Sequence, residues 1–204
     1  MYKTIFIAVL VSLSFLFCSA QTNQPQIWTE KNRQFLLENL ERTRNEVTKE
    51  TENLSLEQWH FKENDTSWSI AQVVEHLGIY ERTFLSESSV IRQGKLEPEL
   101  SVNARTDSLY LAWMNEPQSH IANKIHIPLE LMKGKDNLTF FLYGRNLIVE
   151  FIRTTKDDLK AYYTFRSGDE KRRSLHALFV VHFGHTDRHL RQIRRIKQHR
   201  NFPK

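Results

Sequence analysis

The chain has 204 residues, 40% of them hydrophobic and 26% charged, and a formal net charge of +5. That length suits one ordinary domain with a core of its own. The positive excess is mild. Much of it lies near the C-terminus, on faces of the predicted last helix that point away from the histidines of that helix, so we interpret it as a solvated surface. The charge therefore argues against nucleic acid as a partner.

The first 20 residues have the features of a secretory signal peptide. A basic start is followed by an apolar run over residues 5–17, and small residues, Cys18 and Ala20, stand at −3 and −1. The run is too short for a comfortable bilayer span. We expect cleavage after Ala20, export to the periplasm or the medium, and no membrane span afterwards. Lipid attachment at Cys18 ranks second because Phe17 is larger than a lipoprotein signal normally has there, and an uncleaved anchor ranks third.

Cleavage would also remove the only cysteine, Cys18. An exported domain without cysteine has no disulfides, no thiol nucleophile and no thiolate ligand. Any metal must then be held by His, Asp or Glu.

A polar leader over residues 21–28 precedes a domain that we expect over residues 29–199. Apolar residues recur there at helical spacing, without any alternating strand pattern. The predicted long helices run from Thr29, as N-cap, to about Glu52, from Ile70, after Ser69 as N-cap, to about Gln93, from about Leu138 to Tyr163, and from about Lys171 to Gln198. The pattern predicts an all-α four-helix bundle with a long crossover between helices 2 and 3.

Two connections carry further signals. Trp59 and Trp68 stand in the polar connector between the first two helices, where we expect them to cover the end of the core. The crossover contains one predicted short helix, Asp107–Asn115. Its proline-bounded second half carries His120 and His126, which we interpret as surface residues, with a substrate loop as the alternative.

The last helix carries three histidines and a glutamine along one side: His182, His185, His189 and Gln192. His185 and His189 are one turn apart and can converge on one cation. An inward-facing polar ring without a partner costs roughly 1–3 kcal/mol, so the pair needs either hydrogen-bond acceptors or a metal. His182 and His189 are separated by about 10 Å of helix rise, against metal–nitrogen bonds of about 2.1 Å. A third ligand must therefore come from another element.

His76 on the second helix is the best available third partner. It lies on the flank of the apolar face, one turn from Tyr80, where a side chain can look across a cleft. Taken alone, His76 is more readily interpreted as a half-buried histidine than as a ligand. Glu75 and Asp187 point away from the histidine side on a helical wheel, so no carboxylate is available there as a general base.

Several of these residues together resemble the DinB-like superfamily, a group of four-helix bundles that includes bacillithiol transferases. The similarity covers roughly residues 30–198 and rests on Leu54-Ser-x-Glu-Gln-Trp59, on Trp68-Ser69-Ile70 with His76-Leu77, and on His185-x-x-x-His189-x-x-Gln192-Ile193. The resemblance implies a divalent metal, commonly zinc or nickel, bound by His76, His185 and His189. It also implies metal-dependent transfer of a low-molecular-weight thiol to an electrophile.

Three histidine ligands would leave a coordination position open, the pattern of a catalytic site. The leading hypothesis is an exported metal-dependent thiol transferase or hydrolase acting on a small molecule. The alternatives are a non-catalytic metal-binding or ligand-binding protein of the cell envelope, and a metal-free core. Gln192 and Tyr80 are candidates for orienting a ligand or substrate. His182 departs from the resemblance and is open as a supporting donor, a competing ligand or a core residue. A bundle of this size can be monomeric or can pair as a homodimer.

Overall fold

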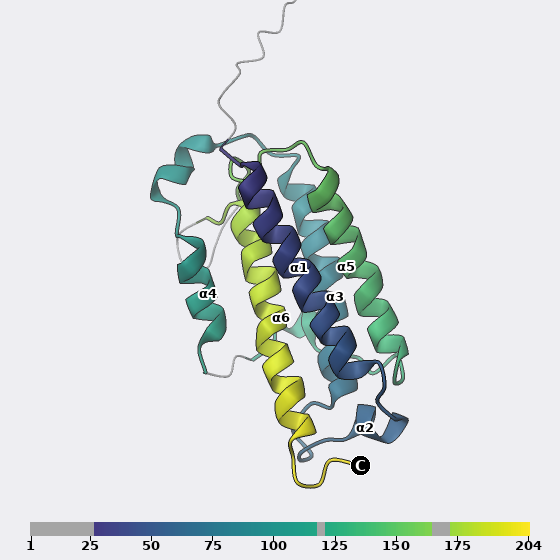
Figure 1. The fold of residues 1–204 in the computed structure, drawn as a ribbon. Coiled ribbons are helices and arrows are strands. Elements are labelled where there is room, and N and C mark those ends of the chain that lie inside the picture. Colours follow the sequence, from purple (N-terminus) through teal and green to yellow (C-terminus); the bar gives the residue numbers. More distant parts are fainter. Residues whose placement is uncertain (1–26, 118–120, 165–171) are drawn as a thin grey trace, which may run out of the picture.

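The computed structural model describes residues 27–117, 121–164 and 172–204. Its long helices are α1 (Glu30–Thr51), α3 (Ile70–Ile91), α5 (Asp136–Thr154) and α6 (Leu175–Lys197) (Figure 1). The described ranges contain no strand, only an isolated bridge between Tyr163 and Ser174. The predicted all-α four-helix bundle is confirmed.

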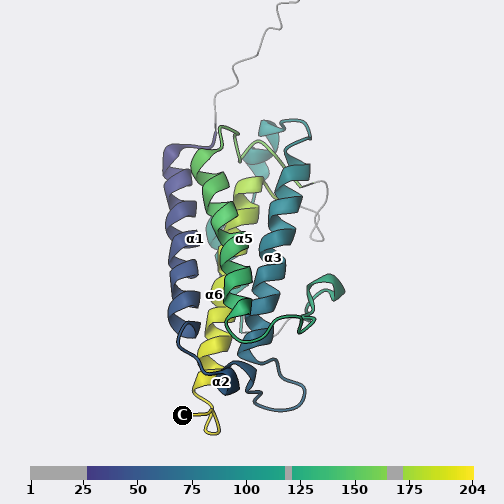
Figure 2. The same ribbon diagram turned by 90° about the vertical axis from the view of Figure 1, so that its right-hand side faces the viewer.

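Each long helix has two neighbours in the bundle. Helices α1 and α3 both pack on α5 and α6, so they occupy opposite corners. Figures 1 and 2 show that α1 and α6 run in one direction and that α3 and α5 run in the other. The connection from α3 to α5 must therefore return along the length of the bundle, as the predicted long crossover requires. No described helix is long and apolar enough to cross a bilayer.

The crossover places a further helix beside α6, outside the four-helix bundle. It contains the 3₁₀ turns η1 (Pro98–Asn103) and η2 (Lys124–His126) and the helix α4 (Asp107–Asn115), which has the predicted bounds and packs along α6. Gly184 permits this approach, because a Cβ there would lie 2.9 Å from Met114 Cγ.

Helix α4 is anchored at both ends. At its start, the Trp28 indole N–H donates to His176 Nδ1 over 3.1 Å, so His176 Nε2 carries the proton that it donates to Asp107 over 3.0 Å. At its end, the Arg188 guanidinium donates to the carbonyls of Trp113 and Met114. Helix α4 is thus a fixed roof over one face of α6.

The helix starts follow the sequence closely. Thr29 and Ser69 are N-caps with complete capping boxes, as their hydroxyl oxygens accept backbone N–H groups three residues on. The connector between the first two long helices also contains a short helix, α2 (Leu56–His60), which is capped by Ser55. This turn carries Trp59 into the core, where it is 1% exposed.

The third long helix was predicted to reach Tyr163 but ends at Thr154. Thr155 adopts an extended ψ, and its hydroxyl accepts the backbone N–H of Asp157. Such local side-chain bonds compete with the helical backbone pattern. Leu159 is nevertheless fully buried, because the irregular segment folds back onto the core. Apolar spacing alone could not reveal that change of backbone.

A buried polar layer crosses the middle of the bundle. Arg145 of α5 is fully buried, and its guanidinium donates to both carboxylate oxygens of Glu81 on α3 over 2.7–3.1 Å. It also donates to Thr43 Oγ1 on α1 over 2.7 Å and to Thr186 Oγ1 on α6 over 2.9 Å. His182 Nε2 lies 2.9 Å from Glu81 Oε2. All four long helices contribute to this layer, and buried charges are tolerated only with such complete partners.

Candidate metal centre

Three histidines from two helices converge on one point. Nε2 of His185 lies 3.3 Å from Nε2 of His76 and 3.1 Å from Nε2 of His189. The ligand atoms of the three residues all lie within 4.8 Å of one another. Two bonds of about 2.1 Å at a tetrahedral angle hold their nitrogens about 3.4 Å apart. The observed spacings therefore suit ligands of a single cation.

The helices place these rings through their apolar packing. His185 and His189 are one turn apart on α6, on the side that faces α3. On α3, the core residues Val73, Val74 and Leu77 are at most 1% exposed, which fixes how far the helix is rotated about its axis. At that rotation the His76 ring faces α6, and its centroid lies 4.7 Å from that of His189.

Hydrogen bonds fix the tautomers of two of the rings. His76 Nδ1 lies 2.7 Å from the carbonyl oxygen of His126, which can only accept, so Nδ1 carries the hydrogen. His189 Nδ1 lies 2.8 Å from Gln192 Oε1 and donates to it in the same way. Both Nε2 atoms therefore present lone pairs to the shared point, the arrangement in which outer partners orient metal-binding histidines.

Within the described part of the chain, the nitrogens of His185 lack the hydrogen-bond partners that would make a cation unnecessary. Its Nε2 faces two acceptor nitrogens, and one hydrogen there could bond to only one of them. Its Nδ1 is buried and has no partner among the residues that the structure describes. A cation at the centre would satisfy all three Nε2 lone pairs, whereas hydrogen bonds within the trio would not. The residues present thus fit a divalent metal.

The surroundings keep these histidines neutral. Burial lowers the pKa of His76 to about 4 and that of His189 to about 3. Burial also lowers the pKa of His185 well below its ordinary value, with neighbouring His189 and His76 adding to the effect. Neutral imidazole is the form that binds metals, so the ligands need not lose a proton near pH 7.

Aromatic rings enclose the trio. The Tyr80 ring lies 4.8 Å from the ring of His76 and 4.3 Å from that of His185, and the Trp68 ring lies 4.9 Å from His76. Burial raises the pKa of Tyr80, so its phenol keeps its proton. Of the two residues expected to orient a ligand, Gln192 accepts a hydrogen bond from His189, and Tyr80 contacts His76 and His185 with its ring.

His126 has a larger part than we expected. Interpreted from the sequence as a surface residue, it is 6% exposed, and its ring stacks on Tyr80 with centroids 3.8 Å apart. Its carbonyl holds His76, and its Nε2 lies 3.1 Å from Thr83 Oγ1. The signal was weak because the crossover has no helical periodicity around it. His120, treated together with it, lies outside the described residues.

His182 belongs to the polar layer and not to the trio. Its Nε2 is turned to Glu81, and its ring packs 4.3 Å from that of Phe84. Burial lowers the pKa of His182, against the effect of Glu81, which raises it. Although burial alone would raise the pKa of Glu81, the charge of Arg145 holds it below its ordinary range. Among the readings left open, the core residue fits these contacts.

The two carboxylates excluded by the helical wheel are occupied elsewhere. Glu75 is 2% exposed and accepts the backbone N–H groups of Leu129 and Glu130, which fixes the chain that follows η2. Asp187 pairs with Arg42 of α1 at 2.7 Å. Neither carboxylate is directed at the three histidines.

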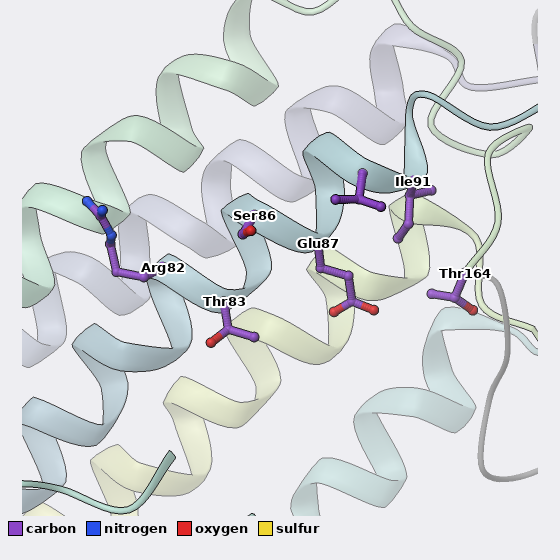
Figure 3. A pocket seen from close by; sticks show the side chains of 7 residues that line it. Arg82, Thr83, Ser86, Glu87, Ile91 and Thr164 are labelled. Atoms are coloured by element: carbon purple, nitrogen blue, oxygen red, sulfur yellow. The ribbon is translucent and has the colours of Figure 1, made fainter. Parts of the chain in front are cut away.

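The trio stands on the wall of a cavity of about 350 Å³ between α3, α6, α4 and the segment around η2. Its lining includes the apolar and aromatic side chains of Trp68, Tyr80, Phe84, Trp113, Leu178 and Val181. An open groove on the outer side of α3 shares Thr83 and Glu87 with this cavity (Figure 3). The volume suits a small molecule.

Comparisons with known proteins agree with this architecture. Among solved structures, YfiT from Bacillus subtilis, described as "a probable metal-dependent hydrolase with an unusual four-helix bundle topology", is similar with a TM-score of 0.57 and 14% identity, over 86% of this chain and 91% of that chain. At that identity the similarity shows the fold alone. No curated protein sequence matches. A sequence model of the DinB superfamily matches residues 39–193, a span that contains all three histidines. Since this match covers most of the chain, the protein belongs to the DinB superfamily.

Proposed function

We propose that the protein is a metal-dependent enzyme that holds a divalent cation with His76, His185 and His189 and acts on a small molecule. The observation that carries this proposal is the convergence of three ring nitrogens, two of them fixed as acceptors, on the wall of the cavity. Three protein ligands leave a coordination position for water or substrate, as catalytic sites do. Zinc and nickel both suit nitrogen ligands.

A divalent cation at this point would lower the pKa of a bound thiol or water and so supply an anionic nucleophile near neutral pH. The side chains around the cation would orient its ligands, bind the substrate and exclude water. Gln192 and the carbonyl of His126 hold two ligands in orientation. The Tyr80 phenol can donate a hydrogen bond to a substrate oxygen, while Trp68 and Phe84 keep bulk water from the reacting groups.

Thiol transfer is the reaction that this cavity favours. A free thiol loses its proton near pH 8.5, so it needs far less activation than water. Glu87 is the only acid among the described residues that line the cavity, and it stands about three turns along α3 from His76. With no carboxylate base beside the histidines, an acidic thiol is the easier nucleophile.

Hydrolysis is the second candidate, since the structurally similar YfiT is described as a probable metal-dependent hydrolase. A binding protein without turnover is the remaining alternative. We further propose that the protein is exported after cleavage behind Ala20, because the first 20 residues have the pattern of a signal peptide. The mass of the protein recovered from cell fractions tests this. A mass that retains Met1 would refute cleavage, and one shifted by acyl chains at Cys18 would identify a lipoprotein.

Metal content is the first test of function. Protein purified without chelator should hold about one divalent ion per chain by elemental analysis. The double variant H185A/H189A should hold almost none. The matched control H60A/H199A removes two histidines outside the cluster and should keep the metal. Equal metal in both variants, or none in the unaltered protein, would refute the metal centre.

Turnover is the second test. The metal-loaded protein is incubated with a panel of thiols and a generic electrophile, and separately with ester and amide substrates. Thiol consumption that disappears on metal removal and returns on reloading supports transfer. Metal-dependent cleavage without a thiol would support hydrolysis instead. Metal binding with neither reaction would favour the binding protein.

A further inference from the structure

The cavity extends well beyond the three histidines. Two of its walls are single faces of the helices α3 and α6, with lining residues about one helical turn apart. They are His76, Tyr80, Phe84 and Glu87 on α3, and Leu178, Val181, His185 and His189 on α6. Between the histidine end and the opposite end the wall is largely apolar. Both Leu178 and His189 of α6 line the cavity, and the eleven residues of helix between them correspond to about 16 Å of rise, so the cavity is elongated along the bundle.

Arg173 stands at the end opposite the histidines, just before α6. It lines the cavity, and its guanidinium carbon lies 5.2 Å from the centroid of the Trp113 ring and 5.8 Å from that of Tyr110. These cation–π contacts hold the guanidinium in place through its flat face, so the N–H donors in the guanidinium plane stay available. Its Nε is buried and finds no acceptor among residues 27–117, 121–164 and 172–204. A buried donor without an acceptor carries a substantial energetic cost.

The neighbouring cations contrast with Arg173. Arg172 forms a paired contact with the carboxylate of Glu97, at 2.5 and 2.7 Å. Arg188, at the histidine end, donates through Nε and Nη2 to backbone carbonyls of α4, and these contacts leave its charge in place. The cavity is therefore positive at both ends, and Arg173 is the lining cation whose buried Nε has no acceptor among the described residues.

Glu87 is the acid nearest to this end. In Figure 3 its carboxylate and the Thr83 hydroxyl leave α3 on the side of α6, whereas Arg82 leaves it towards α5. Burial raises the pKa of Glu87, against the charge of Arg173, which lowers it. The two side chains nonetheless form no ion pair in the described part of the chain. Glu87 thus balances part of the charge without occupying the donors of Arg173.

We propose that Arg173 binds an oxyanion group, a carboxylate or a phosphate, at one end of an elongated substrate whose other end reacts at the three histidines. The planar guanidinium suits two-point contact with either group. The apolar wall of Phe84, Leu178 and Val181 would cover the chain that joins the two ends. This proposal names the substrate class for the function proposed above and rests on it.

The test uses two thiols of equal length that differ only in charge, ω-mercaptohexanoate and ω-mercaptohexanol. Their binding to the zinc-loaded protein is measured by calorimetric titration. The acid should bind at least about tenfold more tightly, as charge-assisted hydrogen bonds would provide. R173Q should lose this preference and keep its zinc, while R173K, which keeps the charge but not the planar group, should retain part of it. R82Q is the matched control, since it removes a nearby charge directed away from the cavity.

Equal binding of acid and alcohol by the unaltered protein, or a preference that survives in R173Q, would overturn the proposal. A third probe, ω-mercaptohexylphosphonate, separates the two sources of the anion: tighter binding than the carboxylate indicates a phosphate. E87Q should strengthen binding of the acid, because it removes a negative charge near the bound oxyanion, and weakening would count against Arg173 as its receptor.

The two proposals can fail separately. If the protein binds no zinc, the proposed function fails, and the Arg173 site is then tested on the metal-free protein. Hexanoate and hexanol are compared there by NMR titration. A preference for hexanoate that R173Q removes supports the anion site without a metal. No preference for hexanoate would refute it.

Discussion

Replacing Arg145 with methionine would expose how the bundle tolerates charge at its centre. In this variant the fully buried Glu81 carboxylate keeps His182 as a partner but loses three contacts of 2.7–3.1 Å to the guanidinium. Thr43 and Thr186 also lose their donor. Breaking a buried ion pair from one side costs about 3–5 kcal/mol, a large part of a typical domain's total of about 5–15 kcal/mol. We expect R145M to be folded only marginally.

The assay is urea unfolding monitored by circular dichroism. The urea concentration at the midpoint is compared between variants whose dependence of unfolding free energy on urea concentration is the same. The double variant E81L/R145M removes both charges and should recover most of the loss, so that its destabilisation is well below the sum of the single changes. The control R153M breaks an exposed contact with Glu41 and should cost less than about 1 kcal/mol. A cost below about 1 kcal/mol for R145M, or purely additive single changes, would refute the view that this pair is mutually dependent.

Three further outcomes follow from the site and its roof. Q192L removes the acceptor of His189 Nδ1–H and should weaken metal affinity by about 10–100-fold in competition with a chromogenic chelator. G184A places a Cβ 2.9 Å from Met114 Cγ and should cost about 1–3 kcal/mol in urea unfolding, since α4 must shift. In metal-free protein the pKa of His76 is about 4 in the folded state and about 6.5 in the unfolded state. Below pH 6.5 the unfolded chain binds a proton that the folded chain does not, so the free energy of unfolding is highest above pH 6.5 and falls as the pH drops towards 4. Urea unfolding across this range should lose up to about 1.4 kcal/mol per pH unit for each such histidine.

Each of these outcomes has a clear contrary result. Q198L, at an exposed glutamine beyond the cluster, should leave metal affinity unchanged, and an equal loss in both variants would contradict the orienting part of Gln192. Alanine normally favours a helix over glycine by about 1 kcal/mol, so a gain in stability for G184A would contradict close packing of α4, while M114A in the same chain should relieve the clash. Stability that stays constant from pH 7 to pH 4.5 would contradict the neutral buried histidines.

The sequence predicts those parts of the fold that local chemistry determines. Thr29 and Ser69 begin helices because their hydroxyls satisfy free backbone donors, and that requirement is visible in a few residues. The end of α5 is not, because Asp157 and Thr155 reorganise the backbone while Leu159 keeps its place in the core. Hydrophobic spacing reports burial and is blind to such an interruption.

The site divides in the same way. Helical spacing allows His185 to pair with His189, and the resemblance to DinB-like proteins selects that pair over His182 with His185. His126, by contrast, holds His76 through a backbone carbonyl 50 positions away, which no side-chain pattern encodes. One member of the buried polar layer can be recognised in the sequence, because Arg145 lies between the buried residues Phe141 and Ile148 on the apolar stripe of α5. A charge in such a position requires partners, but their identity depends on helix packing.

The anchoring of α4 at both ends has a consequence for selectivity. The roof of the cavity is held by the Asp107–His176 contact at one end and by Arg188 at the other. Its conformational entropy is therefore lost during folding, and a ligand that enters beneath it does not bear that cost. Association does not have to wait for α4 to dock, and ligands of similar chemistry should differ mainly in how long they stay bound. In this bundle the shape of the cavity exists before the ligand arrives.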